Sequence, residues 1–380
     1  MSAADRINYG DLLFPIIFKK AAEKLEIPIV FYNYGLVSSN LSHFGALKTE
    51  SYKTFLKRVK KEGGKVVIGG GEVFFPDWTK LYSYINPMYV KLLKSYKFRK
   101  LNTKYNLAAK LLCSRRVREP FCPAQFELSD KVKIHYNSVG GVIKEDFPSE
   151  RQIEISRALL SASSISLRDR RSYDSIKKIK ENAELVADSA IIMSDFFTKD
   201  NLIDLCSSAF NPLNNDYLFI QIGKYYRPKN LNAFVSSLKE LSIQLDVKVL
   251  LCPIGLALGH EDDIVLRQIS TLEETFYYCQ PQNIFEIMYC ISHSKLYLGT
   301  SLHGAITAQS FGVPFIGLNP SIEKLENYNT TWMGEKYKNV PMEELNKIEV
   351  RLRNWDFKYV NERVKKQKQS VYNRIFNILN

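Results

Sequence analysis

The segment from Lys295 to Asn319 restricts the fold of this chain more than any other part of the sequence. It starts with a short apolar run that ends at Gly299, as a buried strand does when it enters a turn. Ser301 then suits the cap of an apolar helix of small residues, and Pro314 separates that helix from a second apolar run. A strand, a helix and a strand in such close succession predict a parallel βαβ unit.

His303 is predicted to lie in the first turn of this helix, just past the carboxyl end of a parallel strand. Open α/β sheets bind ligands at that edge, where free backbone N–H groups and the helix dipole favour an anion. A histidine beside small residues often serves only in packing or capping. Gly304 and Ala305 nevertheless leave room for a ligand to approach the backbone, and we favour a functional role for His303.

The alternation of strand and helix patterns continues through the 380 residues and predicts two α/β domains. Further strands are expected at Ile29–Tyr32, Lys65–Ile68, Val132–Tyr136, Ser164–Leu167, Tyr217–Ile222 and Val247–Cys252. A polar break at 211–216 predicts a linker between an N-terminal domain, 1–210, and a C-terminal domain, 211–348. The predicted fold class is α/β, with two Rossmann-like domains in a GT-B-like arrangement and the active site in the cleft between them.

The end of the chain, residues 349–380, is predicted to be one basic amphipathic helix that packs across the two domains. Its expected buried stripe consists of Trp355, Tyr359, Val364, Tyr372 and Phe376. A second basic helical region is expected from about Lys80 to Leu112.

Composition and cysteine spacing indicate an ordinary cytoplasmic protein. The chain is 45% hydrophobic and 24% charged, and it contains no apolar run near the ~20 residues that a membrane span needs. Its first residues lack the basic and apolar segments of a signal peptide. The six cysteines include no CxxC pair, so we expect reduced thiols and neither disulfides nor a zinc site.

The net charge of +13 is concentrated between Lys91 and Arg118, where ten Lys or Arg residues occur without any Asp or Glu. Such a stretch can be a solvated pair of helices. It can also contact an anionic membrane surface, a polyphosphate-bearing substrate or nucleic acid. The interleaved Leu, Tyr and Phe residues suit an amphipathic surface on lipid headgroups. Because no zinc-finger or RNP-type motif is present, we expect no nucleic-acid partner.

A set of short motifs in a fixed order resembles the polysaccharide pyruvyl transferase family over roughly residues 8 to 330. In chain order, these motifs are Asn8–Asp11, Gly69–Glu72, Arg168–Ser172, Asp188, His260–Asp263, Leu302–Gly304, Gly312–Pro314 and Lys324. Each motif is weak alone, whereas the ordered set is fairly specific.

Two features depart from the family pattern. Many members carry Arg immediately before the Leu-His pair, where it helps to bind phosphoenolpyruvate, but this chain has Ser301. Other cations would then hold the anion, and the candidates are Arg168, Arg170, Arg171 and Lys324. The family also begins with a strand before its first motif, and Met1–Arg6 is too short for a normal one.

The resemblance implies a transferase that attaches pyruvate from phosphoenolpyruvate as a ketal across two hydroxyls of a sugar, with no other cofactor and no metal. It implies His303 and Arg168 as catalytic residues. The donor would be held by Arg168, Ser301, Leu302, His303, Gly304 and Lys324. The acceptor would contact Asn8, Asp11, Gly70, Gly71, Glu72 and His260.

Several of these residues also have structural explanations. Asp169 either orients Arg168 or caps the following helix, and we favour capping. His260 and Asp263 either contact the acceptor or cap their helix. The remaining histidines are assigned to structure: His43, His135 and His293.

For the acceptor we expect a capsular or exopolysaccharide glycan, or its lipid-diphosphate-linked precursor. The basic, aromatic-studded stretch would suit peripheral contact with the anionic inner face of the membrane.

Two other functions remain open. The first is a nucleotide-sugar glycosyltransferase of the same architecture. Retaining members of that class often place a ribose-binding Glu seven residues before the Pro of their G-x-P motif, where this chain has Thr307. No D-x-D motif occurs either. In a non-catalytic glycan-binding relative, the fold would be kept and the donor site lost, which Ser301 would allow.

Overall fold

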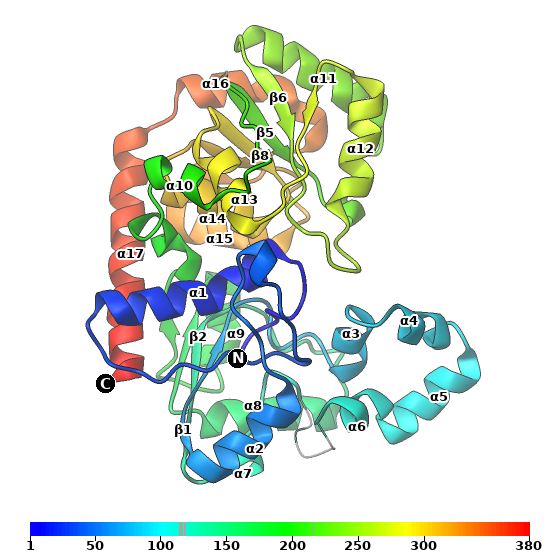
Figure 1. The fold of residues 1–380 in the computed structure, drawn as a ribbon, viewed down its shortest axis with the longest axis vertical. Helices are drawn as coiled ribbons and strands as arrows, with labels where there is room; N and C mark the ends of the chain where they lie inside the picture. Colours follow the sequence, from blue (N-terminus) through cyan, green and yellow to red (C-terminus); the bar gives the residue numbers. More distant parts are fainter. Residues whose placement is uncertain (114–116, 118, 215) are drawn as a thin grey trace.

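The computed structural model describes residues 1–113, 117, 119–214 and 216–380 and contains two parallel β-sheets (Figure 1). The four-stranded sheet has the order β1-β2-β3-β4: β1 Gly64–Gly69, β2 Val132–Val139, β3 Ser164–Leu167 and β4 Glu184–Leu185. The five-stranded sheet has the order β7-β6-β5-β8-β9: β5 Tyr217–Gln221, β6 Lys248–Leu251, β7 Tyr277–Tyr278, β8 Leu296–Gly299 and β9 Phe315–Gly317. All pairs are parallel, which confirms the predicted α/β class.

Helices connect and cover the strands as expected for βαβ units. Around the first sheet they are α2 Tyr52–Glu62, α7 Gln125–Leu128, α8 Ser149–Ser161 and α9 Arg170–Lys177. Around the second they are α11 Leu231–Gln244, α12 Asp262–Leu272, α13 Ile284–Ser292, α14 Leu302–Ser310 and α15 Glu323–Met333. The predicted unit at Lys295–Asn319 is confirmed as β8, α14 and β9, and Oγ of Ser301 accepts the Gly304 N–H as its cap.

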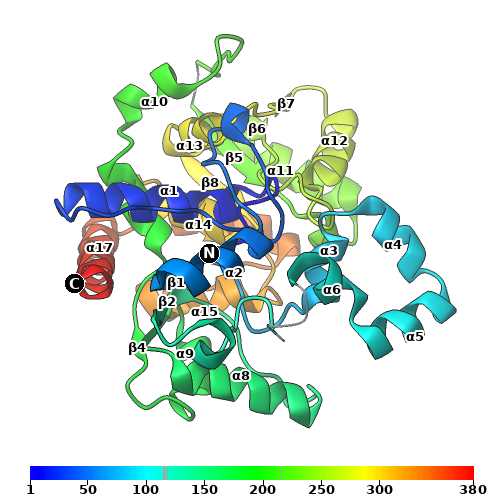
Figure 2. The same ribbon diagram turned by 60° about the horizontal axis from the view of Figure 1, so that its bottom comes forward.

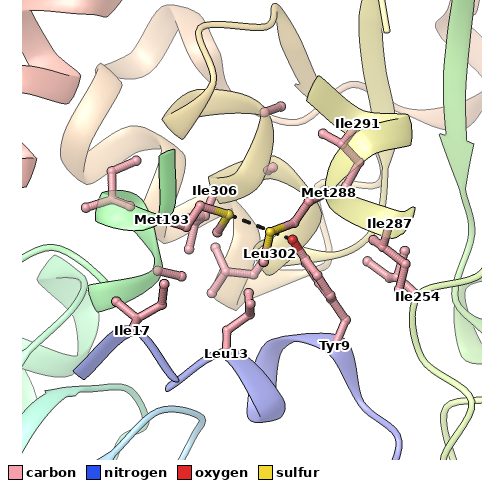
Figure 3. Close-up of a cluster of buried hydrophobic side chains, with 14 of the residues drawn as sticks. Tyr9, Leu13, Ile17, Met193, Ile254, Ile287, Met288, Ile291, Leu302 and Ile306 are labelled. Atoms are coloured by element: carbon pink, nitrogen blue, oxygen red, sulfur yellow. Dashed lines mark hydrogen bonds between the residues drawn. The ribbon is translucent and has the colours of Figure 1, made fainter. Parts of the chain in front are cut away.

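The N-terminal helix α1 (Tyr9–Lys24) packs against the half of the molecule that contains the five-stranded sheet (Figures 1 and 2). One core cluster joins α1 to the 3-10 helix Ser189–Asp195, to α10 (Lys199–Leu205) and to α13 and α14. Figure 3 shows this contact, with Leu13 of α1 and Leu302 and Ile306 of α14 in the same apolar cluster. The burial of these side chains holds the first turns of α1 and α14 together.

The C-terminal region forms two helices, α16 (Ile348–Arg353) and α17 (Phe357–Leu379), instead of the single helix predicted from 349 to 380. Helix α17 begins directly after Asp356, whose carboxylate accepts the Tyr359 N–H and caps the helix. The predicted stripe is partly wrong, since Phe376 is exposed. The residues of α17 that are buried are Val360, Val364, Gln367, Val371, Arg374, Ile375 and Ile378.

Helix α17 contacts both halves of the molecule. Arg374 donates to the carbonyl of Tyr136 on β2 at 2.9 Å, and Tyr328 of α15 donates to Gln367 at 3.0 Å. Figure 1 shows the helix running past both sheets along one side.

The predicted strand at Ile29–Tyr32 is wrong. This segment has no regular secondary structure and pairs with no strand, and a cavity of about 330 Å³ is lined by both this segment and β1. Met1–Arg6 forms no strand. Only Met1 pairs with the edge of β1, donating to the Val67 carbonyl and accepting from the Gly69 N–H.

The basic region predicted as helical from Lys80 to Leu112 is divided into four helices. They are α3 Trp78–Ser83, α4 Pro87–Leu93, α5 Tyr96–Tyr105 and α6 Leu107–Cys113. Asn86 and Ser95 cap new helices, and Asn106 adopts a left-handed backbone that ends α5. Arg115, Arg116 and Arg118 of the predicted basic stretch lie outside the described residues. Across the described part of the chain, no helix combines the length and apolar character needed to cross a membrane.

Candidate active site

A cavity of about 320 Å³ lies where strands of both sheets end. Its walls come from the turns after the carboxyl ends of β1, β3, β5, β6 and β8 and from the first turn of α1. Open α/β sheets place their ligands at this edge. Of the residues predicted as site residues, eleven line the cavity: Asn8, Asp11, Gly70, Gly71, Glu72, Arg168, His260, Ser301, Leu302, His303 and Lys324.

Gly304 is the predicted site residue that does not line the cavity. Its N–H is taken by the Ser301 cap at 3.4 Å, so this group is not free for an anion. A methyl group at Gly304 would overlap the ring and hydroxyl of Tyr297, which is fully buried beneath it. Gly304 therefore allows α14 to pack closely on Tyr297 and is not placed to bind the donor.

His303, Asp188 and Arg168 form a buried group on the cavity wall. Oδ2 of Asp188 accepts a hydrogen bond from Nη1 of Arg168 at 3.1 Å and lies 3.7 Å from Nε2 of His303. The second distance is too long for a hydrogen bond but brings the two groups into electrostatic contact. Nε of Arg168 and Nε2 of His303 are buried without a hydrogen-bond partner in the described structure. Both N atoms are thus candidates to contact a ligand.

The charges in this group stabilise one another. Burial by itself would raise the pKa of Asp188, but His303, Arg168 and the Ala190 N–H outweigh burial and lower this pKa below its ordinary value. Burial likewise opposes the charge of Arg168, yet Asp188, with Asp169 and Glu72, raises its pKa. Asp188 is therefore an anion that holds the Arg168 guanidinium in place.

The backbone of α1 determines where the imidazole of His303 lies. A methyl group at Gly10 would overlap Nδ1 of His303, and the ring of Phe14 meets the imidazole edge-on at 5.4 Å. Tyr9 of α1 is connected to the His303 backbone through Thr307. The Tyr9 hydroxyl is 2.9 Å from Oγ1 of Thr307, and this hydroxyl donates to the His303 carbonyl. Helix α1 thus positions the candidate catalytic histidine.

Among the described residues, two cations besides Arg168 line the cavity. Lys324 was predicted, whereas Arg6, beside Asp5, was not. The other two predicted cations lie elsewhere. Arg170 is exposed and its guanidinium lies near the Tyr173 ring, while Arg171 forms an ion pair with Glu323 at 2.6 Å. Asp169 caps α9, accepting from the Ser172 N–H at 2.8 Å, as we favoured.

The glycine turn after β1 also lines the cavity. Gly70 and Gly71 have φ values of 78° and 71°, which side chains rarely tolerate. A methyl group at Gly70 would also overlap the Phe14 ring. Two further cavity-lining residues are close to each other, with Nδ2 of Asn8 3.3 Å from Nε2 of His260. Burial lowers the pKa of His260, so this side chain is suited to act as a neutral hydrogen-bonding group.

Asp262 is a cavity residue that the sequence analysis missed. Its Oδ2 accepts hydrogen bonds from Gln221 at 2.9 Å and from the N–H groups of Gly255 and Ile254 at 2.9 and 3.2 Å. Burial raises its pKa to about 7, although these bonds oppose the shift. We had singled out Asp263, which does not line the cavity. Adjacent positions at a helix start point in different directions, and sequence alone could not choose between them.

Metal-binding groups do not converge in the described residues, where no three His, Cys, Asp or Glu side chains are placed to share an ion. All six cysteines are free thiols.

Comparisons with known proteins agree with this architecture. The structure of S. aureus MnaA with UDP has a TM-score of 0.56 and 12% identity and covers 96% of this chain and 92% of its own. The UDP-GlcNAc 2-epimerase from Methanocaldococcus jannaschii has a TM-score of 0.52 and 15% identity and covers 96% of this chain and 89% of its own. These likenesses confirm the GT-B-like fold. No curated protein sequence matches the chain.

The sequence profile of one family matches most of the chain. It is described as polysaccharide pyruvyl transferase and covers residues 8–322, from the Asn8 motif to the start of α15. The matched region contains every cavity-lining residue named above except Arg6 and Lys324. By this match, the chain is a member of the polysaccharide pyruvyl transferase family.

Proposed function

We propose that this protein transfers pyruvate from phosphoenolpyruvate to a glycan and forms a ketal across two sugar hydroxyls. Membership of the family supports transfer to a polysaccharide. The observation that carries the donor assignment is the cluster of His303, Arg168 and the start of α14 at one cavity wall. This wall combines a fixed guanidinium with an imidazole whose Nε2 has no hydrogen-bond partner in the described structure, and these groups suit a carboxylate and a phosphate.

In the proposed reaction, two glycan hydroxyl oxygens bond to C2 of phosphoenolpyruvate, and the bond from C2 to the phosphate oxygen breaks. One hydroxyl proton ends on C3, which becomes a methyl group, and the other leaves with inorganic phosphate. We assign the proton transfer at C3 to His303, because its imidazole lies on the cavity wall and its Nε2 has no hydrogen-bond partner in the described structure. Arg168 and Lys324 would hold the donor's anionic groups.

The acceptor would bind between the glycine turn at Gly70–Glu72 and the pair of Asn8 and His260, whose donors and acceptors suit sugar hydroxyls. Asp11 lies beside this turn and adds a carboxylate. We propose a capsular or exopolysaccharide glycan, carried on a lipid diphosphate at the cytoplasmic face of the membrane.

Calorimetric titration with phosphoenolpyruvate tests the donor assignment. We expect binding by the wild type, and loss or at least a tenfold weakening in His303→Ala and Arg168→Lys. His293→Ala and Arg374→Lys are matched controls, because they change a histidine and a buried arginine outside the cavity. Absence of phosphoenolpyruvate binding by the folded wild type would contradict the proposal.

UDP titrated in parallel tests the glycosyltransferase alternative, which the UDP complex of MnaA suggests. One feature of the site disfavours it. Thr307, at the position where retaining glycosyltransferases often carry a ribose-binding Glu, is fully buried and bonded to Tyr9 and the His303 carbonyl. Binding of UDP alone would favour glycosyl transfer, and binding of neither ligand would favour a non-catalytic glycan-binding protein.

A further inference from the structure

We propose that helices α4 to α6 are an arm that docks on an anionic lipid bilayer. The proposal deepens the proposed function, because it rests on that function for the lipid-linked acceptor and identifies the surface that would bring the cavity to it. We call residues 87–113 the basic arm.

The basic arm begins directly beside the cavity. Leu81 of α3 and Tyr84, which follows α3, line the cavity, and the Tyr84 ring lies 6.1 Å from that of His260. From there, α4 and α5 project away from both sheets, and the chain returns along α6 (Figures 1 and 2). A surface that holds the arm would therefore also lie close to the cavity on its acceptor side.

The inner side of the basic arm is already packed. Tyr89 donates to Oδ1 of Asn102 at 2.8 Å, and Nδ2 of Asn102 donates to Thr79 at 2.8 Å. The Tyr89 ring also contacts those of Tyr82 and Phe98. The arm is thus a folded unit, and side chains on its outer side are not needed to hold it together.

Several large apolar side chains of the basic arm are exposed. Met88 is 73% exposed, Tyr96 71%, Leu92 50% and Leu101 47%. Met88 and Leu92 lie four residues apart on α4, as do Leu101 and Tyr105 on α5, so each pair shares one helix face. Folding does not explain such a concentration of exposed apolar side chains, which is typical of a binding surface.

The basic arm also carries a uniform charge. Its cations are Lys91, Lys94, Lys97, Arg99, Lys100, Lys104 and Lys110. The arm contains no Asp or Glu, and none of these cations forms an ion pair within the described part of the chain. Long cationic side chains beside exposed Leu and Met can reach headgroups while the apolar groups enter the acyl boundary. Binding of an acidic protein or a nucleic acid would explain the cations of the arm but not its exposed apolar side chains.

Flotation with lipid vesicles tests this surface. We expect the wild type to bind vesicles of phosphatidylcholine mixed with phosphatidylglycerol much more tightly than vesicles of phosphatidylcholine alone. Lys94→Glu combined with Lys97→Glu and Lys100→Glu should weaken binding to the anionic vesicles by at least about 100-fold. Met88→Ser combined with Leu92→Ser should also weaken it, by about tenfold or more.

Matched controls separate the arm from the protein's overall charge and hydrophobicity. Lys358→Glu with Lys365→Glu and Lys366→Glu makes the same charge change on the exposed face of α17. Ile243→Ser with Leu272→Ser removes exposed apolar groups from the second half of the molecule. Both controls should bind vesicles within about twofold of the wild type, since neither changes the arm.

Three results would overturn the proposal. They are equal binding to neutral and anionic vesicles, arm variants that bind as the wild type does, and an arm charge variant that loses binding while the serine pair keeps it. The last result would assign the arm to an acidic macromolecule. Phosphoenolpyruvate titration of the arm variants separates this question from the proposed reaction. Unchanged donor affinity with lost vesicle binding supports the arm, and vesicle binding without any donor affinity would contradict only the reaction.

Discussion

Arg168 and Asp188 form an ion pair that is almost completely removed from solvent, with side-chain exposures of 2% and 0% and an N–O distance of 3.1 Å. Arg168 follows β3, and Asp188 precedes the 3-10 helix that packs against α1 and α14. The pair therefore joins the end of the first sheet to the helices that carry His303. Both residues belong to the family motifs, but the sequence predicted no role for Asp188.

Asp188→Asn should destabilise the protein strongly. The change would leave the buried Arg168 guanidinium without a counter-charge, and breaking one partner of a buried pair typically costs about 3–5 kcal/mol. Urea denaturation followed by circular dichroism measures the loss. Asp174→Asn, on the exposed side of α9, should change stability by less than about 0.5 kcal/mol. Equal stability of the two variants would show that Arg168 does not depend on Asp188.

Gly10→Ala should weaken phosphoenolpyruvate binding without unfolding the protein. The added methyl group would overlap Nδ1 of His303, so the imidazole must move, at a packing cost of about 1–3 kcal/mol. We expect at least about tenfold weaker donor binding by calorimetry. Gly69→Ala is the matched control, because a methyl group there meets nothing within 4 Å. Similar donor affinity in both variants would argue against a donor-binding role for His303.

Asp262→Asn should become more stable relative to the wild type as the pH rises. Because the folded state raises the pKa of Asp262 from 3.8 to about 7, the folded protein retains a proton that the unfolded chain has lost. The wild type therefore loses stability between about pH 4 and pH 7, by up to about 4 kcal/mol at this site. The asparagine cannot lose that proton, so its advantage should be largest above pH 7.

Thermal unfolding of both proteins across this pH range checks the expectation. Asp263→Asn, the neighbouring change outside the cavity lining, should show no such trend. A difference between Asp262→Asn and the wild type that is independent of pH would mean that Asp262 is ionised throughout, and that the hydrogen bonds from Gln221, Gly255 and Ile254 outweigh burial.

Ser301→Arg should tighten phosphoenolpyruvate binding. Many family members have Arg at this position, and a charge-assisted hydrogen bond to a donor anion is worth about 1.5–3 kcal/mol, or roughly 10- to 150-fold in affinity. The change also removes the α14 cap, which should lower stability by about 1 kcal/mol. Ser301→Ala loses the cap without adding charge, and calorimetry should show weaker binding in this variant than in Ser301→Arg. Equal affinities would mean that Lys324 and Arg6 already bind the anionic groups of phosphoenolpyruvate.

Local sequence patterns determined much of this protein. The apolar run, cap and Gly-x-Pro of Lys295–Asn319 predicted β8, α14 and β9, because strand burial, helix capping and helix termination depend on near neighbours. The wrong strand prediction came from the same reliance on local composition. Ile29–Tyr32 has the composition of a strand, yet a strand requires a partner's hydrogen bonds, and that partner is not beside it.

Which side chains contact one another depends on how the helices and sheets pack. The tertiary structure brought Arg168, Asp188 and His303 together from three distant segments, placed Gly10 against the imidazole, and put Asp262 rather than Asp263 on the cavity wall. In the structure, Gly304 packs on Tyr297 and does not line the cavity. These outcomes depend on how whole helices pack, through contacts between residues far apart in the chain. Local sequence patterns are thus enough to predict most elements and the motif set, whereas the geometry of the site depends on long-range packing.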